Sequence, residues 1–115
     1  MSAAIVNQKF FGLMELDATG MILYSRIERD GGRHLFPTNV TGRNFYTEVA
    51  PFQNIEEFQK CMESFMQSSL QANSIIFTCQ YEDGPLKVKI LLARVRERSG
   101  GDVSKSILVH IRKAQ

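Results

Sequence analysis

The sequence has little that would support a disulfide framework, a metal centre or a membrane span. Only two of its 115 residues are cysteines, Cys61 and Cys79, which are too few and too far apart for stapling disulfides or clustered zinc ligands. Both are expected to be free thiols. No apolar run approaches the roughly 18 residues that cross a bilayer, and the first residues show no basic region followed by an apolar segment. A cytoplasmic protein with no membrane partner is therefore predicted.

Charge of one sign and catalytic motifs are also scarce. The net charge of +2 is too small for a strong field, so nucleic acid is not predicted as a partner. Basic density near Arg26, Arg29 and Arg33, and again from Arg94 to Arg98, is interpreted as solvated charge beside turns. No glycine loop for phosphate, pair of catalytic carboxylates or recognisable serine triad is present. The sequence therefore predicts a protein that is not an enzyme.

The length and composition are those of one folded domain. A chain of 115 residues falls in the usual range for a single core. Hydrophobic residues make up 43% and charged residues 23%, which is typical of globular proteins. We expect a single domain over residues 1–115.

The first half indicates a hairpin followed by short helical turns. Residues 10–16 and 21–24 are strand-like, and the Asp17–Gly20 segment between them has the Asp and Gly of a tight turn. A short helix is predicted over residues 45–49, before Pro51. A longer helix is predicted to begin at Asn54, with Glu57 completing a reciprocal cap.

The rest of the chain indicates one amphipathic helix and three strands. The helix has apolar residues at three- and four-residue spacing and is expected to end between residues 69 and 73. Strand-like alternation follows, and a change of apolar phase near Leu91 predicts a bulge or a strand covered on both faces. The result is an α+β fold, a five-stranded antiparallel sheet with short helices and one longer helix packed on one face. The predicted core is Phe11, Leu13, Ile22, Phe45, Phe58, Met62, Phe65, Phe77, Ile90, Val109 and Ile111.

A known family is visible in residues 42–51, Gly-Arg-Asn-Phe-Tyr-Thr-Glu-Val-Ala-Pro. This string resembles the segment that leads to the chromophore cysteine in the photoactive yellow protein family of PAS domains. The likeness extends to the first hairpin, the helix around Phe58 and the strand that starts at Leu86, so it covers nearly the whole chain. It implies a PAS fold and a sensory role in signal transduction.

The departures from that family fall on its chromophore site. Phe52 stands where the family has the cysteine that forms a thioester with p-coumaric acid, so covalent attachment there is excluded. Ser25 and Arg29 align with the tyrosine and glutamic acid that hold the phenolate. A slip of one residue would offer Tyr24 and Glu28, but it would turn the strand to its opposite face. Arg33 and Leu35 replace the family's threonine and arginine.

Other cofactors are not expected either. PAS domains can bind haem through a histidine, but His34 is a lone loop histidine and His110 is expected on the outer face of the last strand. Flavin photochemistry of the LOV type needs an adduct cysteine in an NCRFLQ-like string, which does not occur here.

Two uses of such a fold remain. The favoured one is protein interaction, with a second copy or a signalling protein, through an apolar surface formed by the chain start and the outer face of the sheet. The alternative is a sensor that binds a small molecule noncovalently, with an arginine pairing an anionic ligand. The expected interface residues are Ile5, Val6, Phe10, Leu91, Ala93, Val95 and Leu108, and the expected pocket residues are Ser25, Arg29, Arg33, Tyr46 and Phe52.

Overall fold

A five-stranded antiparallel sheet forms the centre of the computed structural model, which describes residues 10–27, 40–95 and 106–114. The strand order is β2-β1-β5-β4-β3. The first and the last strand of the chain, β1 and β5, are therefore neighbours, and β5 lies in the middle of the sheet. The α+β architecture expected from the sequence is confirmed. In chain order the elements are β1 (Gly12–Leu16), β2 (Ile22–Ile27), η2 (Phe45–Val49), α1 (Ile55–Gln67), β3 (Ala72–Tyr81), β4 (Gly84–Arg94) and β5 (Ile107–Lys113).

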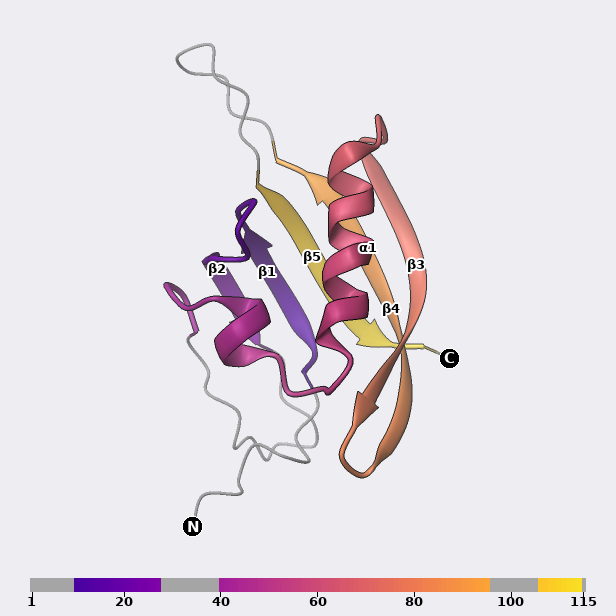
Figure 1. Cartoon of the computed structure of the whole chain (residues 1–115). Coiled ribbons are helices and arrows are strands. Elements are labelled where there is room, and N and C mark those ends of the chain that lie inside the picture. Colours follow the sequence, from indigo (N-terminus) through magenta and orange to yellow (C-terminus); the bar gives the residue numbers. More distant parts are fainter. Residues whose placement is uncertain (1–9, 28–39, 96–105, 115) are drawn as a thin grey trace.

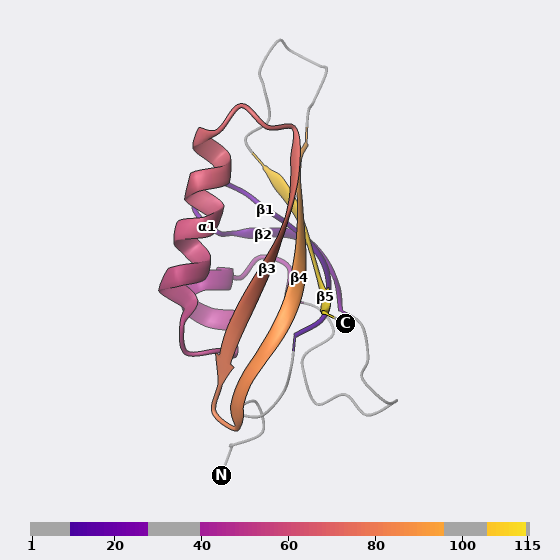
Figure 2. The ribbon, with the colours of Figure 1, turned by 90° about the vertical axis from the view of Figure 1, so that its right-hand side faces the viewer.

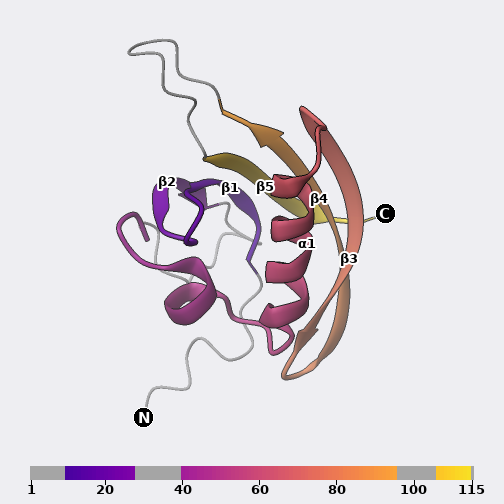
Figure 3. The same ribbon diagram turned by 45° about the horizontal axis from the view of Figure 1, so that its top comes forward.

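Both helices lie on the same face of the sheet. Figure 1 shows η2 over β1 and β2 and the longer α1 over β4 and β3. Seen edge-on, the two helices stand on one side of the strands, and no described element covers the other side (Figure 2). The β3–β4 ribbon curves around α1 (Figure 3). We call the helix-covered side the inner face and the opposite side the outer face.

The inner face carries the core. Inward residues alternate along each strand, as in β4, where Val88, Ile90 and Leu92 are buried. The buried face of α1 is formed by Phe58, Met62 and Phe65, as its spacing predicted. Every other residue of the predicted core is also buried, with the exception of Leu13.

Leu13 lies on the outer face because the apolar phase changes at the start of β1. Phe10 and Phe11 are both buried, and inward residues then continue with Met14 and Leu16. Gly12, with a φ of 145°, marks the change. Leu13 pairs with His110 across β5 and half-faces solvent. The prediction that Leu13 belongs to the core was therefore wrong, because the inward-facing residues of β1 are shifted by one position, to Met14 and Leu16.

The boundaries of α1 differ from the expected signals. The helix starts after Asn54, but the Asn54 side chain makes no cap hydrogen bond. Its Oδ1 accepts from the backbone N–H of Gln80 at 2.9 Å and its Nδ2 donates to the carbonyl of Thr78 at 2.8 Å. The helix ends at Gln67, and Asn73 belongs to β3. Asn54 therefore ties the helix start to the edge of the sheet.

Of the two alternatives expected for β4, a bulge or a strand covered on both faces, the bulge is absent. Pairing with β3 runs without a break from residue 84 to 93, and pairing with β5 continues to Arg94. The change of apolar phase instead reflects a strand with apolar residues on both faces, Ile90 and Leu92 inside and Leu91 and Ala93 outside. Apolar surface is therefore present on the side that no described helix covers.

Candidate functional site

Phe52 is built into an aromatic cluster beneath the two helices. Its side chain is 4% exposed. The centroid of its ring lies 5.8 Å from that of Phe58, 5.9 Å from Tyr81, 6.1 Å from Phe77 and 6.3 Å from Phe45. Tilted and edge-on arrangements at such distances are the favourable ones for aromatic pairs. Protein side chains therefore surround the Phe52 ring on several sides.

Ser25 lies on the inner face of β2, opposite Met14 of β1. Its hydroxyl is 3.4 Å from the hydroxyl of Thr41 and accepts a long hydrogen bond of 3.5 Å from the backbone N–H of Val40. Tyr24 points to the outer face and is 46% exposed. The register therefore decides against the slipped alternative with Tyr24 in the site. Residues Glu28, Arg29, Arg33, His34 and Leu35 lie outside the described residues.

Tyr46 is half-buried between η2 and the first hairpin. Its ring packs near Phe45 and Phe58, with centroids 6.2 and 6.3 Å away. The ring also packs closely against Gly20, because a Cβ added at Gly20 would come within 2.5 Å of Tyr46 Cδ2. Burial, with smaller contributions from Glu63 and Asp17, raises the pKa of Tyr46 to about 12, so the phenol stays neutral at physiological pH.

Asn44 positions η2, and the sequence analysis missed it. Its Oδ1 accepts from the backbone N–H groups of Tyr46 and Thr47, and its Nδ2 donates to the carbonyl of Thr19 in the hairpin turn. The available signal was an asparagine one residue before a short helix, followed four residues later by Glu48. The carboxylate of Glu48 accepts from the Asn44 backbone N–H at 3.3 Å.

The second cysteine belongs to a polar pair inside the core. Burial raises the pKa of the Cys79 thiol to about 12, and a hydrogen bond with Tyr81 opposes part of that shift. Burial also raises the pKa of Tyr81, whose hydroxyl oxygen accepts from the backbone N–H of Phe10 at 3.0 Å. Cys61, in α1, is half-buried and its pKa is raised too, chiefly by burial and secondly by Glu57. Neither thiol is activated as a nucleophile.

An apolar hollow of about 470 Å³ lies on the outer face of the sheet. It brings together Leu91, Ala93 and Leu108, three of the residues expected at an interface. Leu91 is 37% exposed. His110, which was expected on the outer face of the last strand, also lines the hollow. The remaining lining residues, which were not predicted for this surface, are Leu13, Ala72, Asn73, Ser74 and Leu92.

The remaining interface residues fall elsewhere. Val95 is half-buried just beyond β4 and does not line the hollow. Ile5 and Val6 lie outside the described residues. Phe10 is fully buried, with its ring 5.4 Å from that of Phe45 on the inner face. Its assignment to the interface was therefore wrong, because the phase of the first strand shifts at Gly12.

Within residues 10–27, 40–95 and 106–114, no group of three histidine, cysteine or acidic side chains is placed to hold a metal ion. Among the helices of the same segments, none has the length and apolar character that spanning a membrane requires.

The strand order and the helices on one face define the PAS fold. The chain is similar to the PAS-B domain of Drosophila melanogaster Cycle, with a TM-score of 0.55 and 13% identity over 92% of this chain and 100% of that one. At that identity the likeness concerns the fold alone.

Closer relatives identify the family. The chain is 32% identical over 90 residues to the photoactive yellow protein of Halochromatium salexigens, covering 78% of this chain and 72% of the relative. It also matches the photoactive yellow protein domain of the sensor histidine kinase Ppr from Rhodospirillum centenum, with a TM-score of 0.57 and 27% identity over 98% of this chain and all of that one. No family model matches. The chain belongs to the photoactive yellow protein family, and it is a sensory, non-catalytic domain.

Proposed function

We propose that this protein is a PAS sensory or regulatory module that acts by protein–protein interaction in signal transduction and is not a p-coumaric acid photoreceptor. The observation that carries the proposal is the position of Phe52. The family likeness puts a thiol at this position, and here a benzyl side chain is buried among Phe45, Phe58, Phe77 and Tyr81.

The two thiols of the chain are poor substitutes for the missing one. A thioester forms by attack of a thiolate, and the fraction of thiolate at neutral pH falls as the pKa rises. Cys79 is buried with a pKa of about 12. Cys61 sits on α1, lines a different hollow from that of the outer face, and has a raised pKa.

We expect the native protein to stay colourless when it is incubated with thiol-reactive, activated p-coumaric acid. Absorbance and intact mass measure the outcome, and the Cys61→Ser variant controls for acylation of the half-buried thiol. A yellow adduct that persists in Cys61→Ser and bleaches under blue light would contradict the proposal. The Phe52→Cys variant, treated in the same way, reports whether the remaining scaffold can accept the acid once a thiol is supplied.

The outer face supports the interaction part of the proposal. Contiguous exposed apolar surface on a folded domain marks a contact site more often than isolated apolar residues do. The hollow is lined mainly by leucine and alanine side chains from β1, β3, β4 and β5, together with Asn73, Ser74 and His110. The helices stand on the other side of the sheet (Figure 2). A second copy of the chain or a signalling protein could bury this surface.

Leu91→Lys is expected to weaken that contact by at least about tenfold, because a charge in the middle of an apolar interface must be desolvated. Sedimentation at several concentrations, or titration with a candidate partner, measures the change. Gln80→Lys adds the same charge on the same face, but outside the hollow, and should behave as the wild type. Equal binding by wild type and Leu91→Lys would reject the outer face as the contact.

The alternative function is a noncovalent small-molecule sensor with Ser25, Arg29, Arg33 and Tyr46 near the ligand. One observation favours it: the Ser25 hydroxyl turns to the inner face beside the hydroxyl of Thr41. The absorbance of the purified protein, and mass spectrometry of what it releases on denaturation, separate the two functions. A co-purified small molecule would favour the sensor.

A further inference from the structure

The sheet has two edges, and the structure covers them differently. At the β2 edge, the backbone of Ile22 exchanges hydrogen bonds with Arg43 and Gly42, and Met21 forms a bridge with Asn44. At the β3 edge, the chain around residue 54 covers only the end of the strand. The backbone N–H of Gln53 donates to the carbonyl of Gln80 at 2.7 Å, and the Asn54 side chain bonds Thr78 and Gln80.

Along the rest of the β3 edge, outward backbone groups have no partner among the described residues. In an antiparallel ladder, alternate residues bond to the neighbouring strand and those between them point away. The bond from Arg94 N–H to the carbonyl of Gln71 fixes the odd-numbered residues as those that bond β4. Ser74 and Ile76 therefore direct their N–H and C=O groups outward, and within the described segments no hydrogen bond reaches them. Figure 2 shows this edge facing the viewer, uncovered between the end of α1 and the covered end of the strand.

This edge also lacks the features that normally prevent strand pairing. Proteins blunt exposed edges with short strands, charges, prolines or bulges. β3 is ten residues long and pairs with β4 without a bulge, and its sequence, Ala-Asn-Ser-Ile-Ile-Phe-Thr-Cys-Gln-Tyr, contains neither a charge nor a proline. The Ile76 side chain is 61% exposed and that of Leu70, just before the strand, is 48% exposed. The stretch Ala72–Ile76, which we call the open edge, is thus suited to accept another strand.

A second copy of the same chain fits the open edge. Two antiparallel copies of one strand meet about a two-fold axis, and the outward N–H and C=O groups of each copy then face those of the other. The pairing opposes no like charges, because the strand has none. It also closes after two chains, since each copy uses the same edge.

The surface beside the open edge complements such a strand. A hollow of about 330 Å³ lies between α1 and β3 and is lined in part by Leu70, Asn73 and Ile75. In a register centred on Ser74, Ile75 of the partner subunit would lie opposite Asn73, on the same side of the sheet as this hollow. The partner's apolar side chain would then cover apolar surface that the monomer leaves open.

We propose that two copies of this protein pair through Ala72–Ile76 of β3, which joins their sheets into one. This contact is separate from the outer-face contact proposed above, and the two are tested by different variants. A short strand pair buries less surface than a standard interface, so the dimer forms reversibly and depends on concentration.

The test is analytical ultracentrifugation of the full chain over a range of concentrations. Ile76→Pro removes one outward N–H and leaves the β3–β4 ladder intact, because Ile76 does not bond β4. Ile76→Lys keeps the backbone and places a charge on the edge. Each is expected to raise the dimer dissociation constant at least about tenfold. Gln80→Lys, with the same charge where Gln53 and Asn54 already cover the edge, should match the wild type.

Hydrogen exchange provides a second measurement of the proposed contact. In the wild type, the amide protons of Ser74 and Ile76 should exchange more slowly as concentration rises, and Leu91→Lys should leave this effect unchanged. A wild type that is monomeric at every concentration, or a dimer that folded Ile76→Lys retains, would overturn the proposal. Loss of the dimer in Leu91→Lys alone would assign it to the outer face instead.

Discussion

Replacing Phe52 by alanine is expected to reduce the free energy of unfolding by about 3–5 kcal/mol, the usual cost of deleting a buried phenylalanine ring. The ring contacts four other aromatic rings and is almost completely buried, so the deletion leaves a cavity that the cluster can only partly close. For a domain of this size, the melting temperature should fall by about 4 °C per kcal/mol. Urea and thermal unfolding measure the loss.

Two variants sharpen this prediction. Phe52→Leu keeps most of the apolar volume and should cost about 1–2 kcal/mol. Tyr24→Ala removes an aromatic ring that is 46% exposed on the outer face and should cost less than about 1 kcal/mol. If Phe52→Ala were no more damaging than Tyr24→Ala, the Phe52 ring would not be part of the core, and a vacant ligand pocket at this position would become the better interpretation.

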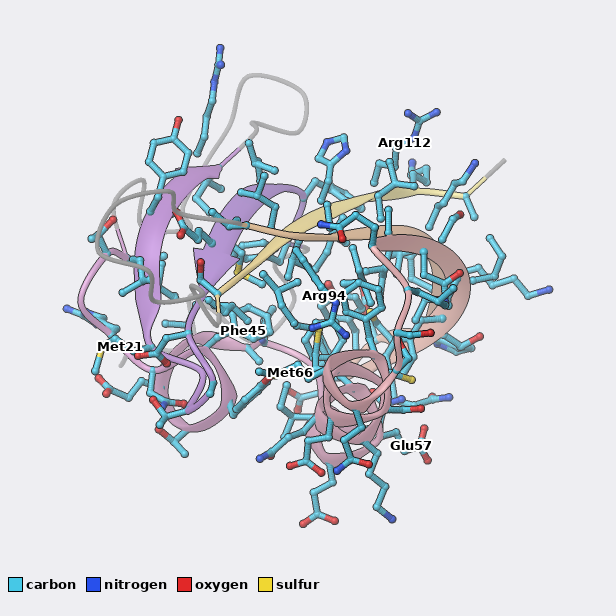
Figure 4. The ribbon with its side chains drawn as sticks, turned by 90° about the horizontal axis from the view of Figure 1, so that it is seen from above. Met21, Phe45, Glu57, Met66, Arg94 and Arg112 are labelled. Carbon is cyan, nitrogen blue, oxygen red and sulfur yellow. The ribbon has the colours of Figure 1, made fainter. Side chains whose placement is uncertain are left out.

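Replacing Arg94 by methionine is expected to cost about 3 kcal/mol in total, the upper end of the range of about 1.5–3 kcal/mol for one hydrogen bond from a charged donor. The Arg94 guanidinium donates to carbonyls in the last turn of α1 and just beyond it. A terminal nitrogen lies 2.8 Å from the Phe65 oxygen and 3.1 Å from the Met66 oxygen, and Nε lies 2.7 Å from the Leu70 oxygen. It also bonds the carbonyl of Ser68. The four bonds do not add in full, because Arg94 is only half-buried and water can replace part of what it supplies. Figure 4 shows Arg94 on the helix side of the sheet, directed to the end of α1.

The reason for this cost is that the last carbonyls of a helix have no partner within the helix. Arg94 supplies partners to these carbonyls, although it shares that of Phe65 with the N–H and the hydroxyl of Ser68. It also places a positive charge at the negative end of the helix dipole and lies 5.1 Å from the centroid of the Phe65 ring. Arg94→Lys keeps the charge but not the planar fork and should lose part of the stability. Arg112→Met, on the opposite face (Figure 4), should stay within about 0.5 kcal/mol of the wild type. Equal costs for Arg94→Met and Arg112→Met in denaturant unfolding would show that the cap is not stabilising.

The site was predictable in part, as Ser25 and Phe52 show. The family likeness aligned both with chromophore residues, and strand alternation required Ser25 and Tyr24 to face opposite sides, which the register confirms. The surroundings of Phe52 could not be read in this way, because its ring partners come from η2, α1 and β3, up to 29 residues away along the chain. Arg29 and Arg33 remain predictions.

Arg94 and Asn54 illustrate what local patterns missed. Arg94 was interpreted as a solvated charge beside a turn, and it caps a helix that ends 27 residues earlier. Asn54 has the composition of a helix cap, yet its side chain bonds the edge of β3. In both cases the residue type shows that the side chain can form hydrogen bonds. Which groups it bonds depends on the tertiary arrangement.

Local sequence patterns specify the order of the elements, the α+β class and nearly all of the core, because alternation in strands and three- to four-residue spacing in helices are properties of neighbouring residues. The inward direction of Phe10 and the outward direction of Leu13 become visible only once the chain is folded. The same is true of the β3 edge, which the described residues leave open between Ala72 and Ile76. Those outcomes depend on how strands far apart in the chain set their register and on which segments return to cover them, and no local pattern encodes either.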